Sequence, residues 1–191
     1  MKNASRSQSD CPYHAVRFYE NEKSLAQMVA EFLADGLNDG EPGMVVATPA
    51  QRAAISRALV TRGVDVVSLQ RSSDLVLLDA EDTLSSFMKN DTLDAKAFED
   101  RMVTLIERAC RGRLNCVVRV YGQMVDVLWQ QGKRELAIDL EILWNQLSST
   151  KRFSLLCGYA MGSFYKDADI EDVRRQHTHV VSADGRAAAV A

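Results

Sequence analysis

Short runs of apolar and β-branched residues alternate along the chain with longer segments whose apolar residues recur every three or four positions. The first pattern is typical of buried strands and the second of amphipathic helices. Strands are expected at residues 15–19, 44–47, 64–69, 75–78, 116–121 and 153–159. Because strands and helices take turns along the sequence, we expect an α/β fold with a mostly parallel central sheet flanked by helices.

Local signals delimit the helices between these strands. Ser24 is expected to open the first helix, which ends near the glycines at 36 and 40. Thr48 is expected to cap the next helix, with Pro49 at its first position and Gly63 after its end. Further helices are expected at residues 95–111 and over a long region after 124, interrupted near Gly132.

Length and composition favour a single domain. The 191 residues, 47% of them hydrophobic, suffice for one substantial core. Residues 1–12 are polar, and residues 182–191 lack apolar periodicity. We therefore expect a folded domain over 13–181, between a disordered N-terminal segment (1–12) and a disordered C-terminal tail (182–191).

Charge and hydropathy exclude several classes of partner. Lys and Arg number 23 against 26 Asp and Glu, so the net charge is -3, and no long run of one sign could follow a phosphate backbone. No apolar stretch reaches membrane-spanning length, and the start lacks the apolar region of a secretion signal. We expect a cytoplasmic protein without nucleic-acid or membrane partners. Its four cysteines would then remain thiols.

The loop before the first helix resembles a phosphate-binding loop only in part. The final Lys23-Ser24 pair is present, but Arg17 and Glu22 stand where that loop requires glycine. Glu20 and Glu22 would also repel a phosphate. Nucleotide hydrolysis is therefore not expected.

A second trace of a nucleotide site is Asp79, which follows the apolar run 75–78. Such an Asp helps to hold magnesium in ATPases, but it can equally cap the loop after a buried strand. The edge of an ancestral nucleotide site would comprise Arg17, Lys23, Ser24, Thr48 and Asp79.

Signals for catalysis or metal binding are sparse. The histidines lie near the two ends, and no nucleophile motif accompanies them. His177 and His179 could present two imidazoles to a metal, or form a structural pair. Cys110 and Cys116 match no common zinc spacing. We expect no catalytic residue, metal or cofactor.

Polar and aromatic residues concentrate between positions 119 and 145, where both tryptophans lie. Ligands of parallel α/β proteins bind at the carboxyl ends of the strands, in apolar pockets with a few polar anchors. The alternative is that these aromatic residues fill a core between helix and sheet. The candidate pocket residues are Tyr19, Tyr121, Gln123, Trp129, Glu141, Trp144 and Tyr159.

Several ordered motifs resemble the MEDS family of sensory domains, known from the dichloromethane-responsive regulator DcmR. They are HAVRFY, EPG, RVYG, LW, LEILWNQL and LCGY, starting at residues 14, 41, 119, 128, 140 and 156, and the resemblance covers about residues 13–181. It implies a RecA/KaiC-like, P-loop NTPase-like fold without a functional Walker A loop. It also implies the sensing of small organic molecules beside a regulatory output module.

The chain departs from the family pattern in two respects. Family members commonly carry Glu where Gln123 stands, and this sequence shows no output domain. We therefore expect a non-catalytic domain that binds a small organic ligand and regulates a partner protein, such as a histidine kinase or an anti-sigma factor. The alternatives are a pure protein-interaction adaptor and an atypical nucleotide-binding domain. The sequence leaves open whether the chain forms a homo-oligomer.

Overall fold

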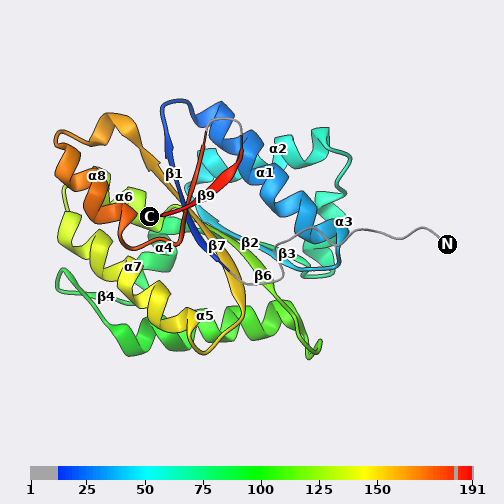
Figure 1. Ribbon diagram of the computed structural model, residues 1–191. Helices are drawn as coiled ribbons and strands as arrows, with labels where there is room; N and C mark the ends of the chain where they lie inside the picture. Colours follow the sequence, from blue (N-terminus) through cyan, green and yellow to red (C-terminus); the bar gives the residue numbers. More distant parts are fainter. Residues whose placement is uncertain (1–12, 183–184, 191) are drawn as a thin grey trace.

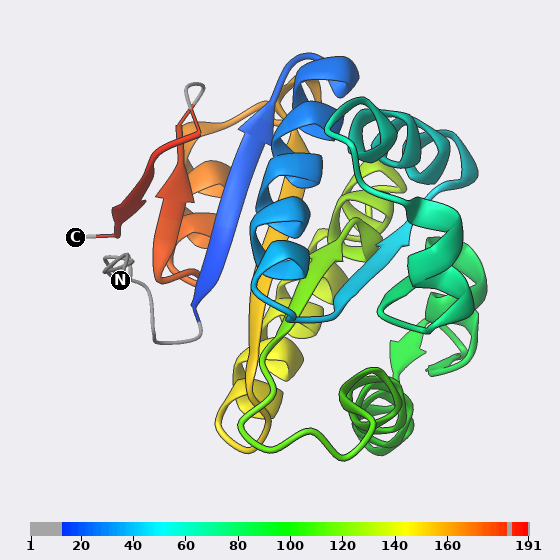
Figure 2. The same cartoon turned by 90° about the vertical axis from the view of Figure 1, so that its right-hand side faces the viewer.

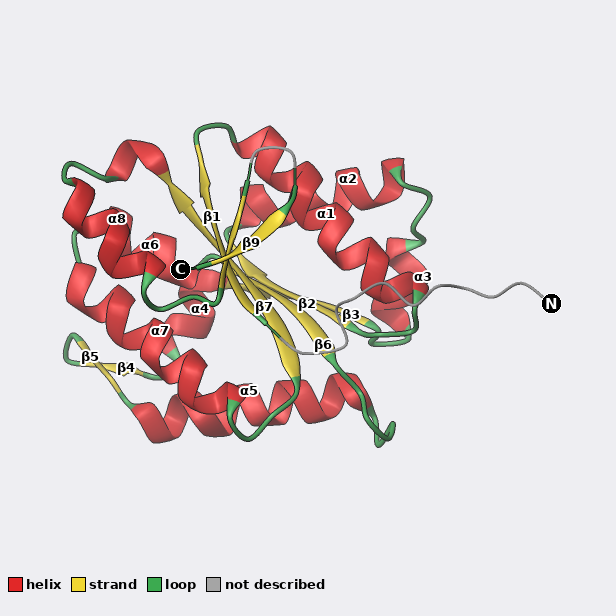
Figure 3. Cartoon of the chain, in the orientation of Figure 1, coloured by secondary structure: helices red, strands yellow, loops and turns green. Residues whose placement is uncertain are grey.

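A computed structural model describes residues 13–182 and 185–190 of the chain. The segment 1–12, expected to be disordered, lies outside the described residues. Helices cover both faces of a seven-stranded sheet, giving three layers (Figures 1 and 3). This architecture confirms the predicted α/β class with a mostly parallel sheet.

The strands of the sheet lie in the order β3-β2-β6-β7-β1-β8-β9. All neighbouring strands are parallel except β8 and β9. Figure 2 looks onto the face covered by α1, with β9 at one edge. The strands are β1 (His14–Tyr19), β2 (Gly43–Ala47), β3 (Leu75–Asp79), β6 (Val118–Gly122), β7 (Phe153–Ala160), β8 (His179–Val181) and β9 (Ala187–Ala189), while β4 (Met88–Lys89) and β5 (Thr92–Leu93) form a separate hairpin.

The helices divide between the two faces of the sheet (Figure 1). One face carries α1 (Glu22–Asn38), α2 (Pro49–Thr61) and α3 (Val66–Arg71). The other carries α4 (Ala80–Ser85), α5 (Ala95–Cys110), α6 (Met124–Gln130), α7 (Arg134–Ser148) and α8 (Asp167–Arg174), with a short 3-10 turn at Met161–Ser163. Alternation along the strands feeds both cores: Val120 packs toward α5–α8, and Tyr121 packs toward α1 and α2.

One predicted strand is wrong. Residues 64–69 were expected to form a strand, but Val66–Arg71 forms α3. Asp65 caps this helix, because its Oδ1 atom accepts a hydrogen bond from the Ser68 amide at 2.9 Å. Val66 is buried whereas Val67 is exposed, so the segment buries one side only. The local cap therefore outweighs the strand preference of the valines, which depends on context.

The cysteines also differ from expectation. Cys110 and Cys116 form a disulfide, with Cα atoms 5.8 Å apart, whereas all four cysteines were expected to be thiols. Arg111 and Asn115 adopt positive φ angles and turn the chain back after α5, so the two residues face each other. Cys157 is a free, buried thiol. Cys11 lies outside the described residues.

The strand β9 lies within the segment 182–191, which was expected to be a disordered tail. It pairs with β8 in an antiparallel ladder from Val181↔Ala187 to His179↔Ala189. Among the helices that the structure describes, none has the length and apolar character needed to cross a membrane.

Candidate functional site

The start of α1 is capped by its own chain. Asn21 Oδ1 accepts hydrogen bonds from the amides of Lys23 (2.8 Å) and Ser24 (3.2 Å), and the Ser24 hydroxyl donates to the Asn21 carbonyl at 2.8 Å. In a phosphate-binding loop, amides at this position face the anion. Here an uncharged side chain already uses them.

Asp79 is likewise engaged in local contacts. Its Oδ1 atom accepts hydrogen bonds from the Glu81 and Asp82 amides at 3.0 and 3.2 Å, which caps α4. Its Oδ2 atom accepts a hydrogen bond from Arg52 Nη2 at 2.9 Å. The capping interpretation of Asp79 is therefore the one that the structure supports.

The other residues of the expected nucleotide edge are separated. Thr48 Oγ1 accepts a hydrogen bond from the Gln51 amide at 3.4 Å and so caps α2. The Thr48 amide and hydroxyl both donate to Gln123 Oε1, at 3.1 and 3.3 Å. Arg17 lies elsewhere, because its Nη1 donates to the Val181 carbonyl on β8 at 3.1 Å.

A buried carboxyl group lies at the carboxyl ends of β1, β6 and β7. Asp126, on α6, accepts hydrogen bonds from the Tyr19 hydroxyl (2.8 Å), Gln130 Nε2 (2.8 Å) and the Ala160 amide (3.0 Å). Burial raises the pKa of Asp126, although these hydrogen bonds offset part of that effect. Burial and the neighbouring Asp126 raise the pKa of Tyr19. Asp126 was not among the predicted pocket residues; its signal in the sequence is an acidic residue within the otherwise apolar run 124–129.

Aromatic side chains fill the space beside this carboxyl group. Trp129 stacks on Phe164 at 4.8 Å and meets Tyr159 edge-on at 5.7 Å between ring centroids. Its indole nitrogen donates to the Ser163 carbonyl at 3.2 Å. Phe18 also packs against Phe164, at 5.5 Å. Bulky rings thus close the strand ends.

Two other predicted pocket residues lie elsewhere in the core. Trp144 is buried between Phe98 and Phe153, with ring centroids 5.1 and 5.6 Å away. Tyr121 lies on the opposite face of the sheet, and its buried hydroxyl has no hydrogen-bond partner among the described residues. Of the seven predicted residues, Tyr159 contacts both Trp129 and Glu141, whereas Trp144 and Tyr121 lie in other parts of the core.

Glu141 is the centre of a second buried polar cluster, on the α7 side of the sheet. Its carboxylate lies 3.2 Å from His14 Nε2 and 3.3 Å from His177 Nε2. The Tyr159 hydroxyl donates to Oε1 at 2.9 Å, and Cys157 Sγ lies 3.5 Å from Oε2. All five residues are buried.

Electrostatics in this cluster are dominated by burial and by Glu141. Burial alone would raise the pKa of Glu141, but the charge and hydrogen bonds of His177 and His14 together hold it below its ordinary value. Burial and the adjacent Glu141 raise the pKa of the Cys157 thiol well above its usual range. The same two causes raise the pKa of the Tyr159 hydroxyl. Of the cluster, the sequence analysis singled out Glu141, Tyr159 and the pair His177/His179; His14 and Cys157 were not connected to them.

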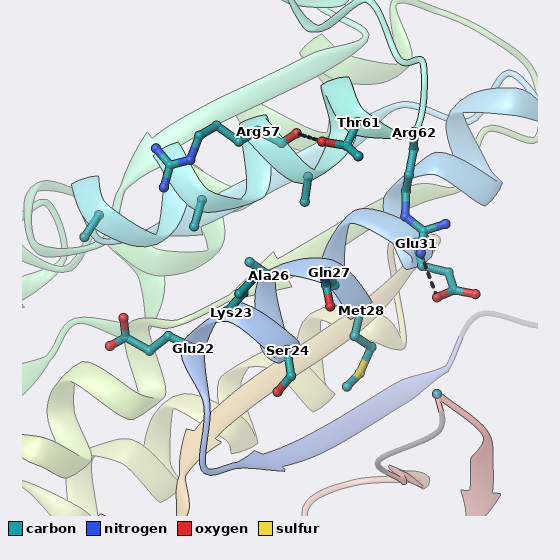
Figure 4. Close-up of a pocket in the computed structure, with 14 residues that line it drawn as sticks. Glu22, Lys23, Ser24, Ala26, Gln27, Met28, Glu31, Arg57, Thr61 and Arg62 are labelled. Carbon is teal, nitrogen blue, oxygen red and sulfur yellow. Dashed lines mark hydrogen bonds and ion pairs between the residues drawn. The ribbon is translucent and has the colours of Figure 1, made fainter.

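A groove of about 1020 Å³ lies between α1 and α2, on the other face of the sheet. Figure 4 shows Lys23, Ser24 and Met28 on the α1 side of this groove, with Glu31 joined to Arg62 across the two helices. That ion pair spans 3.0 Å. The α2 wall combines alanines at four-residue intervals, Ala50, Ala54 and Ala58, with Arg57, Thr61 and Arg62. This alanine periodicity is the sequence signal that could have located the groove.

Comparisons with known proteins agree with this architecture. A crystal structure of a KaiC-like protein from the archaeon Pyrococcus horikoshii OT3 is similar with a TM-score of 0.55 and 12% identity, over 88% of this chain and 69% of that one. At that identity the likeness shows the fold, which is RecA/KaiC-like as predicted. No match was found among curated proteins. Residues 13–178 match the family described as "MEthanogen/methylotroph, DcmR Sensory domain". The chain therefore belongs to the MEDS family of sensory domains.

Proposed function

We propose that this domain is a non-catalytic sensor that binds a small organic ligand in the groove between α1 and α2 and thereby regulates a partner protein. Membership of the MEDS family indicates a sensory role. The observation that carries the proposal is the groove itself, in which four alanines and Met28 are combined with polar and charged side chains and whose lining includes the capped start of α1.

The chemistry around the groove favours an uncharged ligand over a phosphate. Asn21 occupies the amides of Lys23 and Ser24, so they are not free to bind an anion. The charged residues of the groove lining are of both signs, and Glu31 is paired with Arg62 at 3.0 Å. Small-molecule sites combine apolar surface with polar anchors, and here the alanines and Met28 supply the apolar part.

A ligand between two helices can act as a switch. In the groove, Arg62 at the end of α2 forms a hydrogen-bonded ion pair with Glu31 of α1. Both side chains are largely exposed. Exposed pairs of this kind contribute little to stability, so this contact does not fix the helix spacing. A ligand that prefers one spacing would shift the population presented to a partner. We propose a regulatory partner such as a histidine kinase or an anti-sigma factor.

A thermal-shift screen tests the proposal. The probes are short-chain alcohols, ketones and chlorinated alkanes, added to the wild type and to Ala54→Trp, which fills the groove. Ala53→Trp is the matched control, because Ala53 is exposed on the same helix outside the groove lining. A probe that raises the melting temperature of the wild type and Ala53→Trp, but not of Ala54→Trp, supports the proposal. An equal response from Ala54→Trp would refute the location.

A protein-interaction adaptor is the second candidate, favoured by the aromatic rings that close the strand ends around Trp129 and Phe164. In that case no small probe stabilises the folded chain, while the groove-filling Ala54→Trp variant behaves like the wild type in every ligand assay. Isothermal titration with ATP and magnesium separates the third alternative, a nucleotide-binding domain, because that alternative requires binding there.

A further inference from the structure

Four buried side chains with metal-binding donor atoms meet on the α7 side of the sheet. His14 comes from β1, Glu141 from α7, Cys157 from β7 and His177 from the segment after α8. One donor atom of each lies within 4.8 Å of all the others. Four segments far apart in sequence therefore supply two nitrogens, one oxygen and one sulfur to the same point.

The spacing of these donors suits a tetrahedral metal ion. Metal–ligand bonds of about 2.0–2.3 Å around zinc place neighbouring donors about 3.3–3.7 Å apart. His14 Nε2 lies 3.4 Å from Cys157 Sγ and 3.2 Å from Glu141 Oε2. His177 Nε2 lies 3.3 Å from Glu141 Oε1, and Cys157 Sγ lies 3.5 Å from Oε2. His14 and Cys157 approach Oε2 and His177 approaches Oε1, and all four donor atoms lie within 4.8 Å of one another, so an ion bound by a single carboxylate oxygen requires Glu141 or His177 to shift.

Outer hydrogen bonds fix how both imidazoles face the cluster. Asn145 Nδ2 donates to the Gln176 carbonyl at 2.9 Å, so Asn145 Oδ1 is the acceptor for the Nδ1–H group of His14, at 2.9 Å. The Val173 carbonyl can only accept, so His177 Nδ1 donates to it at 2.8 Å. Each ring therefore uses its Nδ1–H group in an outer hydrogen bond and directs its Nε2 atom into the cluster.

This arrangement is that of metal-binding histidines, which commonly donate their outer N–H to a carbonyl or carboxamide oxygen. Each Nε2 atom faces the Glu141 carboxylate, which can only accept, so either a proton on the ring or a metal ion must lie between them. His177 Nε2 is buried and faces Glu141 Oε1 at 3.3 Å. A metal ion would satisfy all of these groups together.

We propose that His14 Nε2, His177 Nε2, Cys157 Sγ and a carboxylate oxygen of Glu141 bind one Zn²⁺ ion. A mixed set of nitrogen, oxygen and sulfur donors favours zinc among the common cellular cations. All four ligands come from the protein and all are buried, so the site is closed and structural. The Tyr159 hydroxyl orients Glu141 from outside.

Such an ion would join β1 and β7 to α7 and to the segment that leads into β8. It lies across the sheet from the α1–α2 groove and does not depend on the proposed ligand. Metal binding and groove binding can therefore fail or succeed separately.

The experiment uses the full chain, stripped of metal with a chelator and then titrated with Zn²⁺ or Co²⁺. One equivalent of bound metal is expected by mass spectrometry of the dialysed protein, and Co²⁺ should give the charge-transfer absorption of a thiolate ligand. A Cys11→Ser background, with and without Cys110→Ser/Cys116→Ser, leaves Cys157 as the thiol observed. His177→Ala and Cys157→Ser should each weaken binding at least about tenfold, since even second-shell changes cost that much.

His179→Ala is the matched control, because His179 is two residues from His177 but bonds to Thr178 and not to the cluster. It should bind metal like the wild type. A folded wild-type chain that retains no metal, or binding that His177→Ala and Cys157→Ser leave unchanged, overturns the proposal. If those variants do not fold, the Co²⁺ spectrum of the wild type tests the proposal instead. A spectrum without thiolate absorption overturns it, because the four side chains are then joined by hydrogen bonds and not by a metal ion.

Discussion

Replacing Asp126 tests how the buried network at the strand ends contributes to stability. In Asp126→Ala, the Tyr19 hydroxyl and the Ala160 amide lose their acceptor, while the exposed Gln130 can turn to water. A buried donor without a partner costs about 1–3 kcal/mol, so two cost about 2–6 kcal/mol. Since domains unfold with about 5–15 kcal/mol, this loss is a large share of the total.

The isosteric variant Asp126→Asn isolates the charge. Burial raises the pKa of Asp126 in the folded state above its value in the unfolded chain, so the folded state binds the proton more tightly. The stability that this proton adds to the folded state is fully present below the pKa of Asp126 in the unfolded chain. It is lost as the pH rises through the pKa of Asp126 in the folded protein. The unfolding free energy of the wild type minus that of Asp126→Asn should therefore fall as the pH rises.

Urea unfolding followed by tryptophan fluorescence, from about pH 4 to about pH 8, measures both effects. Asp126→Ala should be less stable than the wild type throughout. The reasoning fails if Asp126→Ala lies within about 0.5 kcal/mol of the wild type, the range of ordinary surface substitutions. It also fails if the difference between wild type and Asp126→Asn grows with pH.

Three further substitutions test the other assignments. Asn21→Ala should cost about 1 kcal/mol in urea unfolding through loss of the α1 cap; free energies equal to the wild type would contradict the cap. Trp144→Ala should cost about 3–5 kcal/mol because Trp144 fills the core beside Phe98, and a change in probe affinity without that cost would instead mark it as a ligand contact. Asp79→Ala should cost about 1 kcal/mol through the α4 cap while calorimetry detects no ATP binding in either protein; magnesium-dependent binding that only the wild type shows would contradict this.

Periodicity and local signals determined most of the secondary structure. The caps at Thr48 and the turn at Gly132 depend on neighbouring residues alone, so they are readable in the sequence. The loss of the phosphate loop at residues 20–24 is readable for the same reason. The strand expected at 64–69 failed because Asp65 and one-sided burial favoured a helix, and burial is not a local property.

The candidate sites were decided by the tertiary structure. His14 and Cys157 are 143 positions apart, and they meet because β1 and β7 pair in the register Val16↔Cys157. That register, together with the positions of α7 and of the segment after α8, brings Glu141 and His177 to the same point. The groove also requires two helices to pack side by side. Sequence patterns record which face of an element is apolar, but the partner that covers this face is chosen by packing over the whole chain.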